Sequence, residues 1–219
     1  MRIALYHNLP SGGAKRTLAE STQRLAQRHQ FDVYTLSSAN HEFADLRPHV
    51  RGHIVYPFQP LPLLKSPLGR LNQAIRLLDL YRIKAINRRI ALDIQAGSYD
   101  LVVVHHCQVE KSPSLLTYLA ELPTVYYCQE PLRQLYETQP ARPYDDAGSP
   151  RRQVLNRIDP LPRLYTAFLK RNDRQNIRRA RRILVNSAYM QKAVAHIYGV
   201  EPHVSYHGTD AELFRPLSL

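Results

Sequence analysis

The sequence predicts an α/β fold in which a parallel sheet is covered by helices on both faces. Short β-rich runs alternate with longer segments of helical apolar spacing along the 219 residues. The run at 100–107 (D-L-V-V-V-H-H-C) has a continuous β-branched core, which is typical of a strand buried on both faces. Apolar residues make up 44% and charged residues 22% of the chain, which excludes a disordered or fibrous protein.

Strands and helices are expected to alternate along the chain. Strands are expected at 2–7, 31–36, 52–56, 100–107, 124–128, 182–186 and 202–206. Helices are expected at 14–29, 68–96, 112–121, 162–179 and 187–198. Prolines exclude regular elements at 57–67 and 140–150. Ser187 is a good N-cap, and Gly97 and Gly199 are suited to end helices.

Apolar spacing indicates which side of two helices faces the core. In the helix at 14–29, Leu18, Leu25 and Ala26 lie on one side, and charged residues lie elsewhere. In the helix at 68–96, the expected buried stripe consists of Leu71, Ile75, Leu78, Ile83, Ile86 and Ile90.

The net charge of +12 is concentrated in two segments. Residues 151–182 hold eleven basic and two acidic residues, and residues 65–93 hold seven basic and two acidic residues. Such segments suit anionic partners, namely phosphate-bearing ligands, nucleic acid or an acidic membrane surface. Helical spacing places Arg171, Arg174, Arg178 and Arg182 on one side, which equally fits an ordinary solvated face.

The sequence carries no sign of secretion or of a membrane span. The N-terminal run lacks the long apolar region of a signal peptide, and no stretch of about 18 apolar residues occurs. Two cysteines, Cys107 and Cys128, are too few for a disulfide scaffold. We therefore expect a cytoplasmic protein with reduced thiols, placed at the inner face of the membrane if it docks on lipid.

Polar residues follow five of the predicted strands. The carboxyl ends of parallel strands meet at one edge of a sheet, and ligands bind at that edge. The residues expected there are His7, Asn8, Gly12, Gly13, His105, His106, Gln108, Gln129, Glu130, Arg133, Ser187, Tyr189, His207, Gly208 and Asp210. Their convergence predicts a ligand site.

Three stretches resemble the family 4 glycosyltransferases, which have the GT-B fold. H-N-L-P-S-G-G-A-K-R (7–16) resembles the Gly-Gly loop after the first strand of that family. Y-Y-C-Q-E-P-L-R (126–133) resembles its C-H-x-P-x-R segment. The stretch 183–216, which ends V-S-Y-H-G-T-D-A-E-L-F-R-P, resembles its strand, serine-capped helix and crossing towards a second domain. Their order and spacing match over nearly the whole chain.

The resemblance implies the Rossmann-like N-terminal half of a GT-B fold at 1–205, with the start of an interdomain linker at 206–219. It implies a retaining transferase that moves a sugar from a nucleotide-diphosphate donor to a glycan or lipid-linked acceptor. Family members are usually longer and carry most donor contacts in a second domain, so we expect this half to need that domain or a second chain. The implied substrate-binding residues are Gly12, Gly13, Lys15, His105, His106 and Arg133, with Ser187, His207 and Asp210 near the domain junction.

Gln129 and Glu130 are the candidate catalytic residues. Glu130 can orient a sugar hydroxyl or act as a base, or it can simply form an ion pair with Arg133 three residues on. Gln129 stands where several relatives have histidine, and an amide can only form hydrogen bonds. His207 and Thr209 also depart from the family, which commonly has proline and a β-branched residue at these positions.

The glycine and histidine pairs each allow more than one interpretation. Gly12 and Gly13 can form an ordinary tight turn, or they can let backbone N–H groups approach a phosphate or sugar hydroxyl. His105 and His106 are successive strand residues, so only one of them can face the crevice. These residues lack metal-ligand spacing, and helix N-termini with basic groups can neutralise a diphosphate, so we expect no metal.

A different class of function is a non-catalytic basic module that binds nucleic acid or a protein partner. The +12 charge and the arginine-rich helix favour it. The sequence has no helix-turn-helix, RNP or zinc-finger signature, which makes nucleic acid the weaker expectation.

Overall fold

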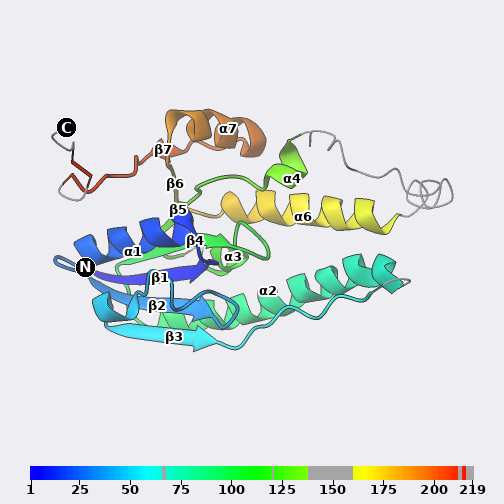
Figure 1. Ribbon diagram of the computed structural model, residues 1–219, viewed down its shortest axis with the longest axis horizontal. Coiled ribbons are helices and arrows are strands. Elements are labelled where there is room, and N and C mark those ends of the chain that lie inside the picture. Colours follow the sequence, from blue (N-terminus) through cyan, green and yellow to red (C-terminus); the bar gives the residue numbers. More distant parts are fainter. Residues whose placement is uncertain (66–67, 120, 138–159, 212–213, 216–219) are drawn as a thin grey trace.

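The seven strands of the structure form one parallel sheet in the order β3-β2-β1-β4-β5-β6-β7 (Figure 1). This computed structural model describes residues 1–65, 68–119, 121–137, 160–211 and 214–215. The strands are β1 (Arg2–Asn8), β2 (Gln30–Leu36), β3 (Gly52–Tyr56), β4 (Leu101–Cys107), β5 (Thr124–Tyr127), β6 (Arg182–Val185) and β7 (His203–Val204). The parallel sheet that the sequence predicted is confirmed, and each strand lies within two residues of its expected bounds.

The helices join successive strands as crossover connections. They are α1 (Gly13–Leu25), α2 (Asn72–Ala96), α3 (Leu115–Tyr118), α4 (Arg133–Tyr136), α6 (Leu161–Ile177) and α7 (Ala188–Tyr198), with 3-10 turns η1 (Arg47–His49) and η2 (Leu68–Leu71). Ser187 caps α7 as expected, because its hydroxyl accepts a hydrogen bond from the Met190 N–H at 3.2 Å. Gly199 then ends this helix in the left-handed conformation, with φ of 63°.

The two faces of the sheet bury separate cores. Ile3, Leu5 and Val33 pack beneath Leu18 of α1 on one face. On the other face, β-strand residues such as Tyr6 and Val104 pack under α2, α3 and α6, which lie together in Figure 1. Side chains alternate along each strand, so the chain needs cover on both sides of the sheet. Helices on both faces are therefore confirmed.

Two helix predictions were wrong in detail. In the helix expected at 68–96, Leu71 of η2 is 47% exposed and Leu78 of α2 is 51% exposed, whereas Ile83 and Ile90 are buried as expected. The side that faces the sheet is made instead of Leu80, Ile83, Asn87, Ile90, Ala91 and Ile94. In α1, Leu18 is buried but Leu25 is 46% exposed. Apolar residues occur on two sides of α2, so spacing alone could not identify the packed one.

The structure also differs from the expected helices between β4 and α6. The helix expected at 112–121 is the four-residue α3, and α4 lies in a stretch where no helix was expected. The expected loop at 140–150 lies outside the described residues. The sheet ends at Val204 of β7, and the division between domain and linker at 205/206 stays a prediction.

Candidate functional site

The loop between β1 and α1 exposes backbone at the carboxyl edge of the sheet. Gly12 has φ of 144° and ψ of −176°, a conformation that is accessible essentially only to glycine. A Cβ atom on Gly12 or Gly13 would meet no other atom within 4 Å. No side chain caps α1, so the N–H groups of its first turn, at Gly13, Ala14 and Lys15, receive no side-chain cap. This arrangement can receive an anion.

Lys15 is buried beside this turn and has an unusual partner. Its side chain is 1% exposed, and its Nζ lies 3.1 Å from Nε2 of His7 at the end of β1. Burial lowers the pKa of Lys15 from 10.5 to about 8. Burial, and then the neighbouring Lys15, hold the pKa of His7 well below its usual range, so His7 is neutral at pH 7.

A neutral imidazole cannot satisfy both groups that approach His7. The Leu9 N–H lies 3.4 Å from Nδ1 of His7, and the Lys15 ammonium faces Nε2. Neutral histidine has only one acceptor nitrogen, so one of these two donors lacks an acceptor while Lys15 is charged. An ammonium has three N–H donors, and His7 is its one hydrogen-bond partner within the described residues. The remaining N–H donors of the ammonium have no hydrogen-bond partner among the described residues.

His105 continues the site towards β5. It is 6% exposed, and burial lowers its pKa to about 3, with Lys15 and His106 adding to the effect. Its ring lies 5.5 Å from the ring of Tyr127, whose hydroxyl is 3.3 Å from Nδ1 of His207. The Nδ1 atom of His105 is buried and has no hydrogen-bond partner in the described structure. The structure thus joins Lys15, His105 and His207 along one edge.

His106 lies on the opposite face of the sheet, as alternation requires. It is 8% exposed, and burial together with the nearby Lys111 lowers its pKa to about 3. Lys111 forms an ion pair at 2.9 Å with Glu130, the candidate base. The proposed partner of Glu130, Arg133, is instead 62% exposed and lies 3.8 Å from Glu137. The alternative interpretation, an ion pair between Glu130 and Arg133, is therefore not what the structure shows.

The remaining predicted residues have varied surroundings. Gln129 has a buried Nε2 atom without a hydrogen-bond partner in the described structure. The Ser187 hydroxyl is engaged at the α7 cap. Asp210 forms an exposed ion pair at 3.4 Å with Arg24 of α1. Ser187, Arg133 and Asp210 thus make contacts of their own outside the group around Lys15.

Sequence reasoning missed Lys111 and Tyr127 as parts of the site. Lys111 has φ of 55°, and its backbone pairs with Cys107 in a tight reversal directly after β4. A lysine in this conformation gives no turn signal in the sequence, because glycine or asparagine usually occupies such positions. Tyr127 could have been suspected, since it is the last residue of a strand that ends at the same edge.

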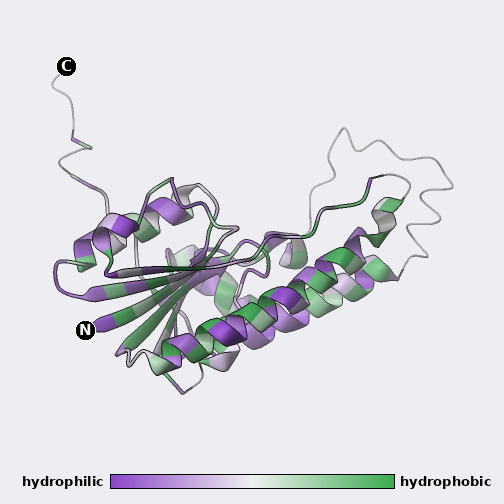
Figure 2. Cartoon of the chain, turned by 90° about the horizontal axis from the view of Figure 1, so that it is seen from below, coloured by the Kyte–Doolittle hydropathy of each residue, from purple (hydrophilic) through white to green (hydrophobic). Residues whose placement is uncertain are grey.

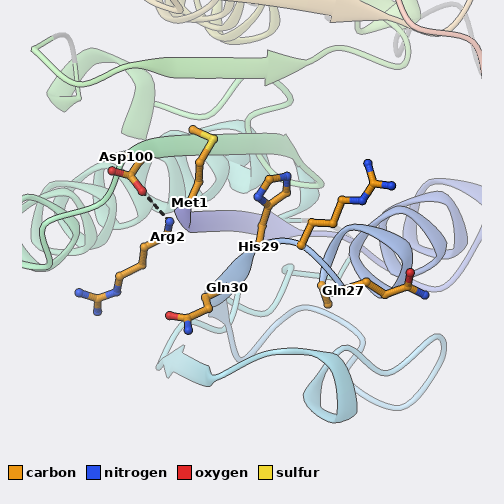
Figure 3. A pocket seen from close by; sticks show the side chains of 8 residues that line it. Met1, Arg2, Gln27, His29, Gln30 and Asp100 are labelled. Atoms are coloured by element: carbon orange, nitrogen blue, oxygen red, sulfur yellow. Dashed lines mark hydrogen bonds between the residues drawn. The ribbon is translucent and has the colours of Figure 1, made fainter.

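A hollow of about 550 Å³ lies elsewhere, at the amino ends of the strands (Figure 3). Met1, Arg2, His29, Gln30 and Asp100 line it, and the Arg2 N–H donates to Asp100 at 2.7 Å. The Arg2 guanidinium is engaged by Asp32 on β2. This open, polar hollow lies at the end of the strands opposite the carboxyl edge, so it is not the candidate site.

Within the described residues, no group of three or more histidine, cysteine, aspartate or glutamate side chains is placed to hold a metal ion. No described helix is long and apolar enough to cross a bilayer.

Comparisons with known proteins show the family and the fold of the chain. Residues 11–213 match the family model described as Glycosyltransferase Family 4. No curated protein sequence matches the chain.

Several solved structures share the fold. HepE of Anabaena, solved with UDP and glucose, is 18% identical with a TM-score of 0.53, over 97% of this chain and 46% of its own. UGT89C1 of Arabidopsis thaliana, solved with UDP, is 11% identical with a TM-score of 0.53, over 95% and 48%. Sucrose-phosphate synthase of Thermosynechococcus elongatus is 13% identical with a TM-score of 0.52, over 99% and 50%. The chain therefore spans about half the length of these structures.

Proposed function

Because the chain belongs to glycosyltransferase family 4, we propose that it is the acceptor-binding half of a retaining glycosyltransferase with a nucleotide-diphosphate sugar as donor. The observation that carries the proposal is the buried Lys15 ammonium beside the uncapped first turn of α1. Helix N-termini and lysine are suited to phosphate groups. HepE, with a similar fold, was solved with UDP and glucose.

The chemistry assigned to this edge is stabilisation of the leaving diphosphate. Negative charge develops on the diphosphate as the sugar–oxygen bond breaks, and fixed donors aimed at it lower the barrier. The N–H groups after Gly12 and the Lys15 ammonium are such donors. In this proposal they neutralise the charge of the diphosphate, so no metal ion is required. In a retaining transfer the leaving phosphate can itself accept the proton of the acceptor hydroxyl, so a weak base suffices.

Glu130 and Gln129 are assigned to the acceptor. Glu130 is half-exposed and paired with Lys111, so its carboxylate is held at the carboxyl end of β5 and can still orient a hydroxyl. Gln129 can contribute hydrogen bonds only. The acceptor is a glycan or a lipid-linked sugar, and an anionic membrane surface is a further partner of the proposal. Most donor contacts are assigned to a second domain or second chain, because the matched structures are about twice as long.

The experiment compares Gly13→Ala with Gly12→Ala by thermal unfolding with and without UDP or inorganic pyrophosphate. A Cβ at Gly13 meets nothing within 4 Å, so the fold is retained while the approach of a ligand to the backbone is blocked. We expect UDP and pyrophosphate to raise the melting temperature of the natural chain and to have a smaller effect on Gly13→Ala. Gly12→Ala is the control for backbone strain, since its φ of 144° disfavours alanine.

A transfer assay then tests the reaction itself. The chain is incubated with a panel of nucleotide sugars, alone and with a polypeptide that carries the donor-binding domain. Transfer that requires both supports the proposal, and Glu130→Gln is then expected to lower kcat more than it raises KM. Failure of UDP and pyrophosphate to stabilise the natural chain, together with silence in both transfer assays, contradicts it.

A further inference from the structure

Two helices reach beyond the carboxyl ends of the strands. Figures 1 and 2 show α2 and α6 side by side, with their N-terminal halves projecting past the sheet. The rings of Tyr81 and Phe168, one from each helix, lie 5.6 Å apart. We call this projection the arm, and it comprises residues 57–65, 68–82 and 161–170. It extends in the same direction as the carboxyl edge that holds the candidate site.

The arm is braced by a buried carboxylate. Asp79 has no exposed surface and accepts hydrogen bonds from Arg76 at 2.8 Å and from Arg82 at 2.7 Å. The same carboxylate accepts the Leu61 N–H at 3.1 Å, and Asn72 bonds the backbone of Leu64 in both directions. The proline-rich segment is thereby fastened along α2.

The outer end of the arm exposes large apolar side chains. On α2 and the turn before it, Leu71, Leu78 and Tyr81 follow one another at spacings of a single helix face and are 47%, 51% and 59% exposed. The neighbouring exposed leucines are Leu63 at 49%, Leu64 at 38%, Leu68 at 55% and Leu164 at 60%. Figure 2 shows hydrophobic stretches recurring to the outer ends of both helices. A cluster of this kind on the surface marks a contact site.

Among the described residues of the arm, the exposed charges are basic. Lys65, Arg163 and Arg171 are exposed on or beside the arm. The acidic residues of the two helices near them, Asp79 and Asp173, are buried and accept hydrogen bonds. An apolar tip with exposed bases is complementary to a surface of phosphate headgroups over hydrocarbon. Pairing of two copies through this face would bring like charges together, which disfavours a second copy.

We propose that the tip of the arm, formed by Leu63, Leu64, Leu68, Leu71 and Leu164, docks on an anionic lipid surface. The leucines enter the boundary between headgroups and acyl chains, and the basic residues lie against lipid phosphates. The inference deepens the proposed function, because it identifies the surface at which the acceptor is met. Docking is measured without any transfer, so its failure is distinguishable from failure of the proposed reaction.

The test is co-sedimentation of the full chain with vesicles of phosphatidylcholine alone or mixed with phosphatidylglycerol. The variant is the triple change Leu68→Ser, Leu71→Ser and Leu164→Ser, which alters exposed side chains only. The control is Leu92→Ser, because Leu92 is 59% exposed on α2 but lies near the C-terminal end of that helix, away from the tip. Circular dichroism verifies that both variants are folded.

We expect the natural chain and Leu92→Ser to bind the anionic vesicles and the triple variant to bind at least about tenfold more weakly. Binding of the natural chain is expected to weaken in about 1 M salt, where charges are screened beyond about 3 Å. Equal binding of the triple variant, equal loss in Leu92→Ser, or no binding to anionic vesicles would overturn the proposal. Leucine-dependent dimerisation in sedimentation velocity would overturn it in favour of a second copy of the chain. Salt-sensitive retention of a DNA duplex without vesicle binding would overturn it in favour of nucleic acid.

Discussion

Replacement of Lys15 by methionine tests whether a charge is buried for the sake of a ligand. Methionine keeps the length of the side chain and removes the ammonium. A pKa lowered from 10.5 to about 8 corresponds to about 3 kcal/mol against the charged form, at about 1.4 kcal/mol per pH unit. Solvent at the open edge screens part of this cost, and the lost hydrogen bond to His7 offsets about 1 kcal/mol. We expect Lys15→Met to raise the free energy of unfolding by about 1–2 kcal/mol at pH 7.

The pH dependence gives the sign of the effect. The folded state releases the Lys15 proton near pH 8, whereas the unfolded state keeps it to 10.5. The natural chain therefore regains stability as the pH rises from 8 to 10.5, and the advantage of the variant shrinks over that range. Below pH 8 both states carry the charge and the advantage is fully present.

The measurement is urea unfolding followed by circular dichroism at pH 7 and pH 10, with Lys192→Met as the control. Lys192 is exposed on α7, so its replacement is expected to change the unfolding free energy by less than about 0.5 kcal/mol. Inorganic pyrophosphate is then added to each protein. We expect it to stabilise the natural chain and Lys192→Met but not Lys15→Met. A destabilised Lys15→Met refutes the buried-charge reasoning, and undiminished stabilisation by pyrophosphate refutes Lys15 as the anion contact.

Three further outcomes are expected. Burial raises the pKa of Glu110 from 4.5 to about 7, so its folded form binds more protons and stability falls by about 3 kcal/mol as pH rises through this range. Glu110→Gln, whose oxygen can still accept from Ser114 and Asn87, removes that fall in a pH series of urea unfolding. Burial lowers the pKa values of His105 and His106 from 6.5 to about 3. The unfolded chain therefore binds more protons than the folded chain as pH falls below about 6.5, and the protein loses stability. Calorimetry at pH 4 to 7 on the Glu110→Gln background measures this loss. Replacing Tyr127 by phenylalanine removes the hydroxyl near His207 and is expected to weaken UDP binding less than Gly13→Ala does, as measured by calorimetric titration.

Each of these three has a contrary result. An unchanged pH profile in Glu110→Gln shows that this carboxyl is not the titrating group. Stability that stays constant from pH 7 to 4 on that background contradicts the burial of neutral histidines. Complete loss of UDP binding in Tyr127→Phe, with Gly13→Ala unaffected, moves the ligand away from the α1 turn.

The parallel sheet could be predicted because short β-rich runs alternate along the chain with segments of helical apolar spacing. The continuous β-branched core of D-L-V-V-V-H-H-C predicted a strand buried on both faces. In the structure this strand is β4, which lies inside the sheet between β1 and β5. The packing of α2 could not be predicted in the same way. Leu71 and Leu78 lie roughly a third of a turn around the helix from Ile83 and Ile90. Both sides carry apolar residues, so spacing alone does not state which side faces the sheet.

The sequence predicted which edge of the sheet carries the candidate site, but it did not predict the side-chain contacts at that edge. Strand ends located His7, His105 and Gln129, since parallel strands place their carboxyl ends together. The burial of Lys15 was not predictable, because a lysine in the first turn of a helix is ordinarily solvated. The Glu130–Lys111 pair depends on a backbone reversal after β4 that no turn signal announces.

The bracing by Asp79 also has a geometric consequence for the proposed reaction. A proline-rich strap fastened along α2 gives the arm little freedom to bend, so a docked tip holds the carboxyl edge at a fixed height above the lipid. In the proposed docked state, this fixed height sets how far an acceptor group must extend from the lipid surface to reach the carboxyl edge. We expect transfer to a series of lipid acceptors with increasing spacer length to peak at one length, and Asp79→Asn, which loosens the strap, to broaden that peak.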